Sequence, residues 1–422
     1  MTISSMLAGA AAAFDVDAAT RAYLAMVQGP ARARSDAYFE GGYWLLLWGA
    51  LLTVAVNWAL LHFGWSARWS AWAGRIARRP ALRTMLYALP YIATTSLLVM
   101  PWTIYTRFFR EHQYGMSNLS FGAWAAEQFI DLAITLVVGA LILAAIFAVI
   151  RRFPRSWWLW GTGVTTAFLT LGILISPVFI APLFNTYKPM PDSPLRTEII
   201  AMAKAQGIPA NDVFVFDASR QTDRISANVS GLGPTIRISL NDNLLNRTGP
   251  EEVKAVMGHE MGHYVLGHGQ ELLLFTSLIF LGVFLLLWWL SPLVLARYGA
   301  RWGVRQVSDP AVLPLFAIIM SLAMLFATPL TNSLTRWNEI EADRFGLDAA
   351  REPDGFAKVA MRLSEYRKLE PHPLEEAIFF THPSGENRAR MSMEWKAKHL
   401  TELAAEDRVI KRPAPLPVKT AE

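Results

Sequence analysis

Six long apolar runs restrict the fold of this chain more than any other feature. They cover residues 43–63, 84–104, 127–150, 157–181, 271–296 and 310–331. A helix needs about twenty apolar residues to cross a bilayer, and each run reaches that length. Of the 422 residues, 53% are hydrophobic and only 17% are charged, which is unusual for a soluble protein. We therefore expect a mainly α-helical membrane bundle of about six spans.

The polar stretch between the fourth and fifth runs predicts a separate α+β domain. Its pattern indicates a helix at 194–206, strands at 213–216 and 236–240, and a long helix at 249–268. Thr248 and Glu251 have the spacing of a capping box for that last helix. The predicted organisation is an N-terminal arm (1–42), spans one to four (43–181), a catalytic domain (182–270), spans five and six (271–331), a C-terminal catalytic helical part (332–410) and a disordered tail (411–422).

The motif His259-Glu260-Met261-Gly262-His263 lies in the long helix. Residues four apart lie above one another on one helix face, so both imidazoles can reach one metal ion. Glu260 is offset and can take a proton from an activated water. The chain has no cysteine, so any metal site must use His, Asp or Glu. The motif therefore predicts a zincin-like HExxH helix with one Zn²⁺ per chain. His268 would lie on the opposite face, and we expect it to cap the helix end.

A catalytic zinc needs a third protein ligand and an open position. Glu339 and Asp343 follow the last apolar run and lie four residues apart, on one helix face, whereas Glu341 points away. This favours Glu339 as the third ligand and Asp343 as an acceptor that orients a ligand imidazole. Taken alone, the same residues also fit a solvated acidic helix start.

Several ordered motifs carry a family resemblance over about residues 43–391. They are Ile180-Ala181-Pro182-Leu183-Phe184, the HExxH helix, Glu339-Ile340-Glu341-Ala342-Asp343, and Thr381-His382-Pro383 followed by Arg388. In these features the chain resembles the type I CAAX prenyl proteases, which are integral-membrane zinc endopeptidases. The resemblance implies that Glu339 is the third metal ligand and Asp343 the outer carboxylate. It also implies that His382 and Arg388 bind the substrate backbone and stabilise the oxyanion.

The segment before Val229-Ser230-Gly231 departs from the family pattern. Ser226-Ala227-Asn228 stands where the family often has Asn-Ala-Tyr. By resemblance, Ala227, Asn228 and Val229 belong to the edge strand on which an extended substrate lies. Asn228 either replaces the usual asparagine or simply begins the strand. Eukaryotic members also have one more N-terminal span.

Three functions follow as hypotheses. The first is a CAAX-type endopeptidase that cuts near the C-terminus of lipidated or amphipathic peptides. The second is a broad-specificity peptidase for membrane-protein quality control, because the Ala- and Arg-rich, Lys-poor composition is typical of bacteria, which generally lack prenylated proteins. The third is a channel, transporter or insertase with structural zinc, which would leave Glu260 without a role. The expected partners are a peptide or protein substrate and the bilayer, and not nucleic acid.

The composition favours a multi-pass protein of the bacterial inner membrane. Two observations disagree about which side the catalytic domain faces. The short loops on the other side contain eleven arginines, which favours a catalytic domain outside the cytoplasm, whereas the family resemblance implies a cytosolic one. Long domains weaken the charge rule, so the sequence leaves the side open, and the family resemblance slightly favours the cytoplasmic side.

Overall fold

The computed structural model describes residues 14–231 and 236–405. The predicted tail at 411–422 lies outside the described residues. The chain divides into two compact units: unit 1 comprises Met1–Tyr43, Asn185–Gly269 and Pro329–Glu422, and unit 2 comprises Trp44–Phe184 and Gln270–Thr328. Unit 2 holds most of the apolar helices, and unit 1 holds the small sheet and the HExxH helix.

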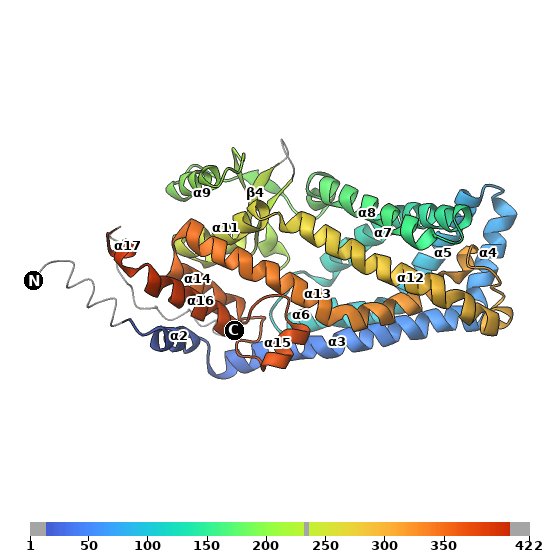
Figure 1. Cartoon of the computed structure of the whole chain (residues 1–422), viewed down its shortest axis with the longest axis horizontal. Helices are drawn as coiled ribbons and strands as arrows, with labels where there is room; N and C mark the ends of the chain where they lie inside the picture. Colours follow the sequence, from blue (N-terminus) through green and yellow to red (C-terminus); the bar gives the residue numbers. More distant parts are fainter. Residues whose placement is uncertain (1–13, 232–235, 406–422) are drawn as a thin grey trace, which may run out of the picture. The chain divides into compact units, whose positions relative to one another are not determined.

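Within the described residues, six helices are long and apolar enough to cross a membrane, which confirms the predicted number of spans. The shorter elements among them are α4 (Trp65–Ile76), η1 (Tyr105–Phe109), α6 (Arg110–Gln113), η2 (Ser176–Ile180), η3 (Ala181–Leu183) and η6 (Pro310–Val312). The long helices themselves are α3 (Gly29–His62), α5 (Pro80–Ile104), α7 (Phe121–Arg152), α8 (Trp157–Ile175), α12 (His268–Trp302) and α13 (Leu313–Ala350) (Figure 1).

Helix α13 extends well beyond the apolar run that predicted it. The run ends at residue 331, but the helix continues without a break to Ala350. No glycine or proline lies between residues 331 and 345, so no residue in this segment breaks the helix. The helix that carries the sixth span therefore also presents Glu339 and Asp343 in unit 1.

Unit 1 contains a four-stranded sheet in the order β1-β2-β4-β3. The outer strand β3 is antiparallel to β4, and β4 is parallel to β2. Apolar residues of β2, β4, α9 and α11 form one buried cluster, which includes Ile199, Val213, Ile238 and Met257. The elements are β1 (Tyr187–Pro189), α9 (Pro194–Ala205), β2 (Val213–Phe216), η4 (Ala218–Arg220), β3 (Ala227–Ser230), β4 (Arg237–Asn241), α10 (Asp242–Arg247) and α11 (Pro250–Val265).

The two ends of α11 differ from the sequence prediction. The helix is capped one residue later than expected, because the Gly249 N–H donates to the Glu252 carboxylate at 2.8 Å. Thr248 instead closes α10, where its hydroxyl donates to the Leu244 carbonyl at 2.5 Å. At the other end, α11 stops at Val265, and Gly267 adopts a φ of +75° before α12 begins. The predicted single helix at 249–268 is therefore wrong at its end.

Glycines allow α11 and α13 to cross closely at the HExxH motif. A Cβ atom on Gly346 would lie 2.7 Å from the backbone nitrogen of His259, and one on Gly258 would lie 2.8 Å from the Gly346 carbonyl oxygen. Real Cβ atoms do not approach this closely. The two helices that carry the predicted metal ligands therefore meet backbone to backbone.

Further helices of unit 1 share a second buried core. Tyr23, Met361 and Met393 belong to one buried cluster, and the Tyr23 hydroxyl donates to Asp354 at 2.6 Å. Segments far apart in the sequence are thus held in one core. The remaining helices are α2 (Val16–Leu24), α14 (Pro353–Leu363), α15 (Pro373–Phe379), α16 (Gly385–Lys398) and α17 (Leu400–Ala405).

Candidate metal centre and cleft

Three side chains from two helices converge on one point. His259 Nε2 lies 3.1 Å from His263 Nε2, and the Glu339 carboxylate lies 3.3 Å from the first and 3.4 Å from the second. In an ideal tetrahedral site with bonds of about 2.0–2.1 Å, ligand atoms are separated by about 3.3–3.4 Å. The three donors therefore already have nearly the spacing of three corners of a zinc tetrahedron.

The protons of the two imidazoles also fit a metal. His259 Nδ1 lies 2.7 Å from Asp343, and an acceptor there holds the proton on Nδ1. The lone pair of His259 Nε2 then faces His263 Nε2 and the Glu339 carboxylate, whose residue is only 7% exposed. Lone pairs and a carboxylate that converge in a buried place need a cation between them. The site thus fits Zn²⁺, with His259, His263 and Glu339 as the ligands.

Asp343 lies at the centre of this arrangement. It is fully buried and accepts hydrogen bonds from Arg388 Nε at 2.9 Å and Arg388 Nη2 at 2.5 Å. Two of the guanidinium nitrogens are therefore committed to Asp343. Arg388 also lines the cleft, so it both positions Asp343 and contributes positive charge at the site.

His268 is a residue whose role the sequence reasoning missed. It is 4% exposed, and its Nδ1 lies 2.9 Å from His263 Nδ1. Its Nε2 lies 3.4 Å from the Glu341 carboxylate. If His263 binds a metal through Nε2, its Nδ1 must carry the proton and donate it to His268. The predicted position on the far helix face was wrong because the turn at Gly267 redirects the chain. The signal was a third histidine five residues after His263.

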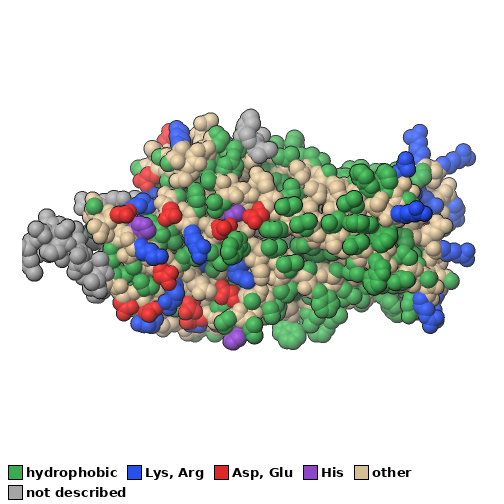
Figure 2. All heavy atoms as spheres, viewed as in Figure 1, with side chains coloured by type: hydrophobic (Ala, Val, Ile, Leu, Met, Phe, Trp, Pro, Cys, Tyr) green, Lys and Arg blue, Asp and Glu red, His purple; other side chains and the backbone are tan. Residues whose placement is uncertain are grey.

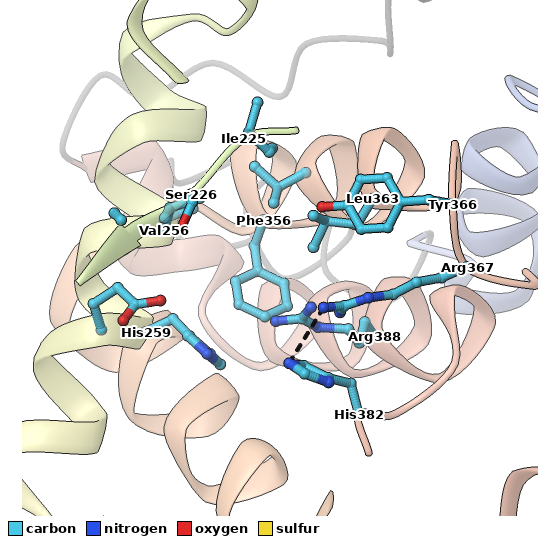
Figure 3. A pocket seen from close by; sticks show the side chains of 14 residues that line it. Ile225, Ser226, Val256, His259, Phe356, Leu363, Tyr366, Arg367, His382 and Arg388 are labelled. Carbon is cyan, nitrogen blue, oxygen red and sulfur yellow. Dashed lines mark hydrogen bonds between the residues drawn. The ribbon is translucent and has the colours of Figure 1, made fainter. Parts of the chain in front are cut away.

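Glu260 lies beside a cleft of about 210 Å³. Burial raises the pKa of its carboxyl towards neutral pH, which makes the carboxylate a stronger base. Apolar and polar side chains share the cleft wall, so it can hold a peptide with its scissile bond next to the carboxylate. The lining residues include Ile225, Ser226, Ala227, Val256, His259, Phe356, Leu363, Tyr366, Arg367, His382 and Arg388 (Figure 3).

His382 projects towards the ligand group from the loop before α16. Its Nε2 lies 3.2 Å from the Glu339 carboxylate and 3.3 Å from Arg367 Nη2, the contact drawn in Figure 3. Burial and the neighbouring Arg367 lower the pKa of His382 to about 3, so the ring is neutral at neutral pH. A neutral imidazole donates one hydrogen bond, which suits a group that contacts a developing oxyanion. Arg367 was not predicted from the sequence, because only the fold brings it here.

Strand β3 is an edge of the sheet and borders the same cleft. The Asn241 N–H donates to the Ser226 carbonyl at 2.9 Å, so Ser226 and then Asn228 turn their backbone groups towards β4. The backbone groups of Ala227 and Val229 consequently point away from the sheet. These two residues offer an extended peptide a place to pair, whereas Asn228 completes the ladder.

Two family models match almost the whole chain. The model described as "Peptidase family M48" matches residues 189–396, which contain all the residues of the metal group. The model described as "CAAX prenyl protease N-terminal, five membrane helices" matches residues 26–186.

Individual proteins agree with these matches. The chain is 27% identical over 356 residues to the "uncharacterized metalloprotease YhfN" of Bacillus subtilis, covering 83% of each chain. It is 26% identical over 307 residues to "CAAX prenyl protease 1" of Saccharomyces cerevisiae, covering 69% of this chain and 67% of the relative. The crystal structure of Ste24p from S. mikatae has the same fold, with a TM-score of 0.73 over 87% of this chain and 90% of that one, at 20% identity.

Proposed function

The chain belongs to peptidase family M48 and is a multi-pass membrane metalloprotease, and we propose that it is an endopeptidase that binds one zinc per chain. The observation that carries the proposal is the convergence of His259, His263 and Glu339, with donor separations of 3.1–3.4 Å, beside a cleft that Glu260 borders. A channel or insertase with structural zinc is not supported, because the family is one of peptidases.

The residues around the metal group have distinct proposed roles. Zinc bound there supplies Lewis-acid activation of a water and of the peptide carbonyl. Glu260 takes the proton of the attacking water and returns it to the leaving amine. His382 donates a hydrogen bond to the developing oxyanion, and Arg388 adds positive charge while it holds Asp343. The outward backbone groups of Ala227 and Val229 align the substrate as an added strand.

We propose that the substrate is a peptide segment of a membrane-associated protein. The names of several relatives specify CAAX prenyl proteases, which favours a cut near a lipidated C-terminus. The Ala- and Arg-rich, Lys-poor composition favours the second candidate, a broad-specificity quality-control peptidase of a bacterial inner membrane. Cleavage assays on a prenylated peptide and its unmodified counterpart separate the two: the first candidate requires a strong preference for the lipid, and the second does not.

The Glu260→Gln variant tests the catalytic proposal. It should bind one equivalent of zinc and lose a factor of about 10²–10⁴ in turnover, because the base is removed and the ligands stay. The control variant Glu394→Gln removes an exposed carboxylate of α16 that lies outside the metal group, and it should keep most of its turnover. Near wild-type cleavage by Glu260→Gln would refute the base assignment. Membrane proteomics with the same variant would show the uncleaved substrates and their compartment.

We further propose that the catalytic unit faces the cytoplasm, as the family resemblance implies. The arginines of the loops on the other side are the observation against it. The chain has no cysteine, so single-cysteine variants can be labelled without background. In intact cells, a membrane-impermeant maleimide should leave Lys204→Cys unlabelled and label Arg78→Cys. The reverse pattern would place the catalytic unit outside the cytoplasm.

A further inference from the structure

A second cavity lies in unit 2, where helices α7 and α8 meet α12. Its volume is about 690 Å³, within the range of about 300–1,000 Å³ that is typical of small-molecule sites. None of its residues belongs to the metal centre or to the catalytic cleft. The lining residues are Ile150, Arg151, Pro154, Arg155, Trp157, Trp288, Trp289, Pro292, Gln306, Val307 and Ser308.

The polar part of this cavity consists of cations and hydrogen-bond donors. Arg151 donates to the Thr84 hydroxyl at 3.3 Å, and no described carboxylate forms an ion pair with Arg151 or Arg155. Ser308 donates to the Gln306 side-chain oxygen at 3.3 Å, which leaves the Gln306 amide group available as a donor. Two guanidinium groups and neutral donors around one space are the recognition chemistry of a phosphate.

The rest of the cavity wall is aromatic. Trp157 is 2% exposed and stacks on Phe316 with ring centroids 5.7 Å apart, so it forms a rigid base. Trp288 donates to the Pro154 carbonyl at 3.2 Å and thereby ties α12 to the connection between α7 and α8. Trp289 is 59% exposed. Trp157 is the first residue of α8, and tryptophans at the ends of membrane helices lie at the depth of lipid headgroups. Trp288 and Trp289 lie further inside α12, where acyl chains can pack on them.

The surroundings carry a large excess of positive charge. Figure 2 shows Lys and Arg side chains gathered at the end of unit 2 where α4 lies. The loops and helix ends concerned contain a single carboxylate, Asp309, which accepts from Ser70 at 2.6 Å and lies 3.8 Å from Arg83. The arginines are Arg68, Arg75, Arg78, Arg79, Arg83, Arg151, Arg152, Arg155, Arg297, Arg301 and Arg305.

From these observations we infer that the cavity binds the phosphate headgroup of an anionic phospholipid, with Arg151 and Arg155 as the principal contacts. The same arginines and neutral donors could also bind free inorganic phosphate. The aromatic wall and the position at the ends of membrane-spanning helices favour the lipid, because a free anion gains nothing from exposed tryptophan. The inference is independent of the peptidase chemistry, and it assigns a second, non-catalytic ligand site to the chain.

Native mass spectrometry of the full chain, released from detergent, tests the site. Wild type should bind phosphatidylglycerol more tightly than phosphatidylcholine, and a large excess of inorganic phosphate should not displace the lipid. The double variant Arg151→Gln/Arg155→Gln should weaken phosphatidylglycerol binding about thirtyfold, as expected for the loss of two direct charge-assisted contacts to the phosphate. If the double variant does not fold, Arg155→Gln alone, at an exposed position, should weaken binding about fivefold, because one direct contact to the phosphate is lost.

The matched control is Arg297→Gln/Arg301→Gln, which removes the same charge from the same end of unit 2 and does not line the cavity. It should change the affinity less than about threefold, because only the diffuse field is reduced. Equal weakening by both double variants would overturn the site and leave only diffuse attraction. Equal affinity for the two lipids, or displacement by inorganic phosphate, would overturn the lipid assignment.

Discussion

Arg388 holds the fully buried carboxylate of Asp343 with two hydrogen bonds, 2.9 Å and 2.5 Å long. The same carboxylate lies 2.7 Å from Nδ1 of His259. A guanidinium from α16 therefore fixes an acid on α13, and that acid fixes a metal ligand on α11. The metal geometry depends on a contact between residues forty-five positions apart.

The first prediction concerns this pair. Arg388→Ala leaves a buried carboxylate without its partner, so the free energy of unfolding should fall by about 3–5 kcal/mol. Chemical unfolding in detergent measures the loss. In a double-mutant cycle, adding Asp343→Asn should recover part of it, because the uncompensated charge disappears. Additive losses would show that the pair is not coupled.

The second prediction concerns His268. His268→Ala removes the group that accepts the His263 proton, so zinc affinity should fall by about 10–100-fold. Competition against a chromophoric chelator measures the affinity without any substrate. His62→Ala, a histidine outside the metal group, is the control and should bind zinc like wild type. Unchanged affinity in His268→Ala would mean that His263 needs no orienting partner.

The third prediction separates binding from chemistry at His382. His382→Ala should retain its zinc and lose a factor of about 10²–10³ in kcat, because one oxyanion donor is gone. KM should change much less, since the contact strengthens only as charge develops on the carbonyl oxygen. A large rise in KM with kcat unchanged would instead make His382 a ground-state binding residue.

The fourth prediction tests the crossing of α11 and α13. A Cβ on Gly346 would lie 2.7 Å from the His259 nitrogen, so Gly346→Ala must move the helices apart. We expect a stability loss of about 1–3 kcal/mol from this overpacking and weaker zinc binding, because Glu339 moves with α13. Gly269→Ala is the control, since a Cβ there meets nothing within 4 Å. Equal stability of both variants would contradict the close crossing.

The fifth prediction tests the edge strand. Val229→Pro removes an outward N–H and keeps the ladder to β4, so the protein should fold and bind zinc, and KM for a peptide should rise. Asn228→Pro removes a group that faces β4 and should destabilise the sheet itself. If Val229→Pro cleaves peptides with unchanged KM, the substrate does not pair with this strand at that residue.

Much of this protein could be predicted from the sequence because its strongest signals are local. Six apolar runs are long enough to span a bilayer, and the number of spans follows from length and composition alone. His259 and His263 are four residues apart, so helix geometry places them together wherever the helix packs. The strand at 213–216 was also predicted with the bounds that the structure has.

The contacts between distant segments could not be predicted from the sequence. Spacing on one helix made Glu339 a candidate ligand, but only the crossing of α13 over α11 puts its carboxylate within 3.4 Å of both imidazoles. His268 was misplaced because one glycine with positive φ interrupts the helical period. Arg367 carries no local signal at all. Periodicity shows which face of a single helix or strand a residue occupies. A site built from several elements depends on how those elements pack together. Their packing is decided by the apolar surface that the whole fold buries.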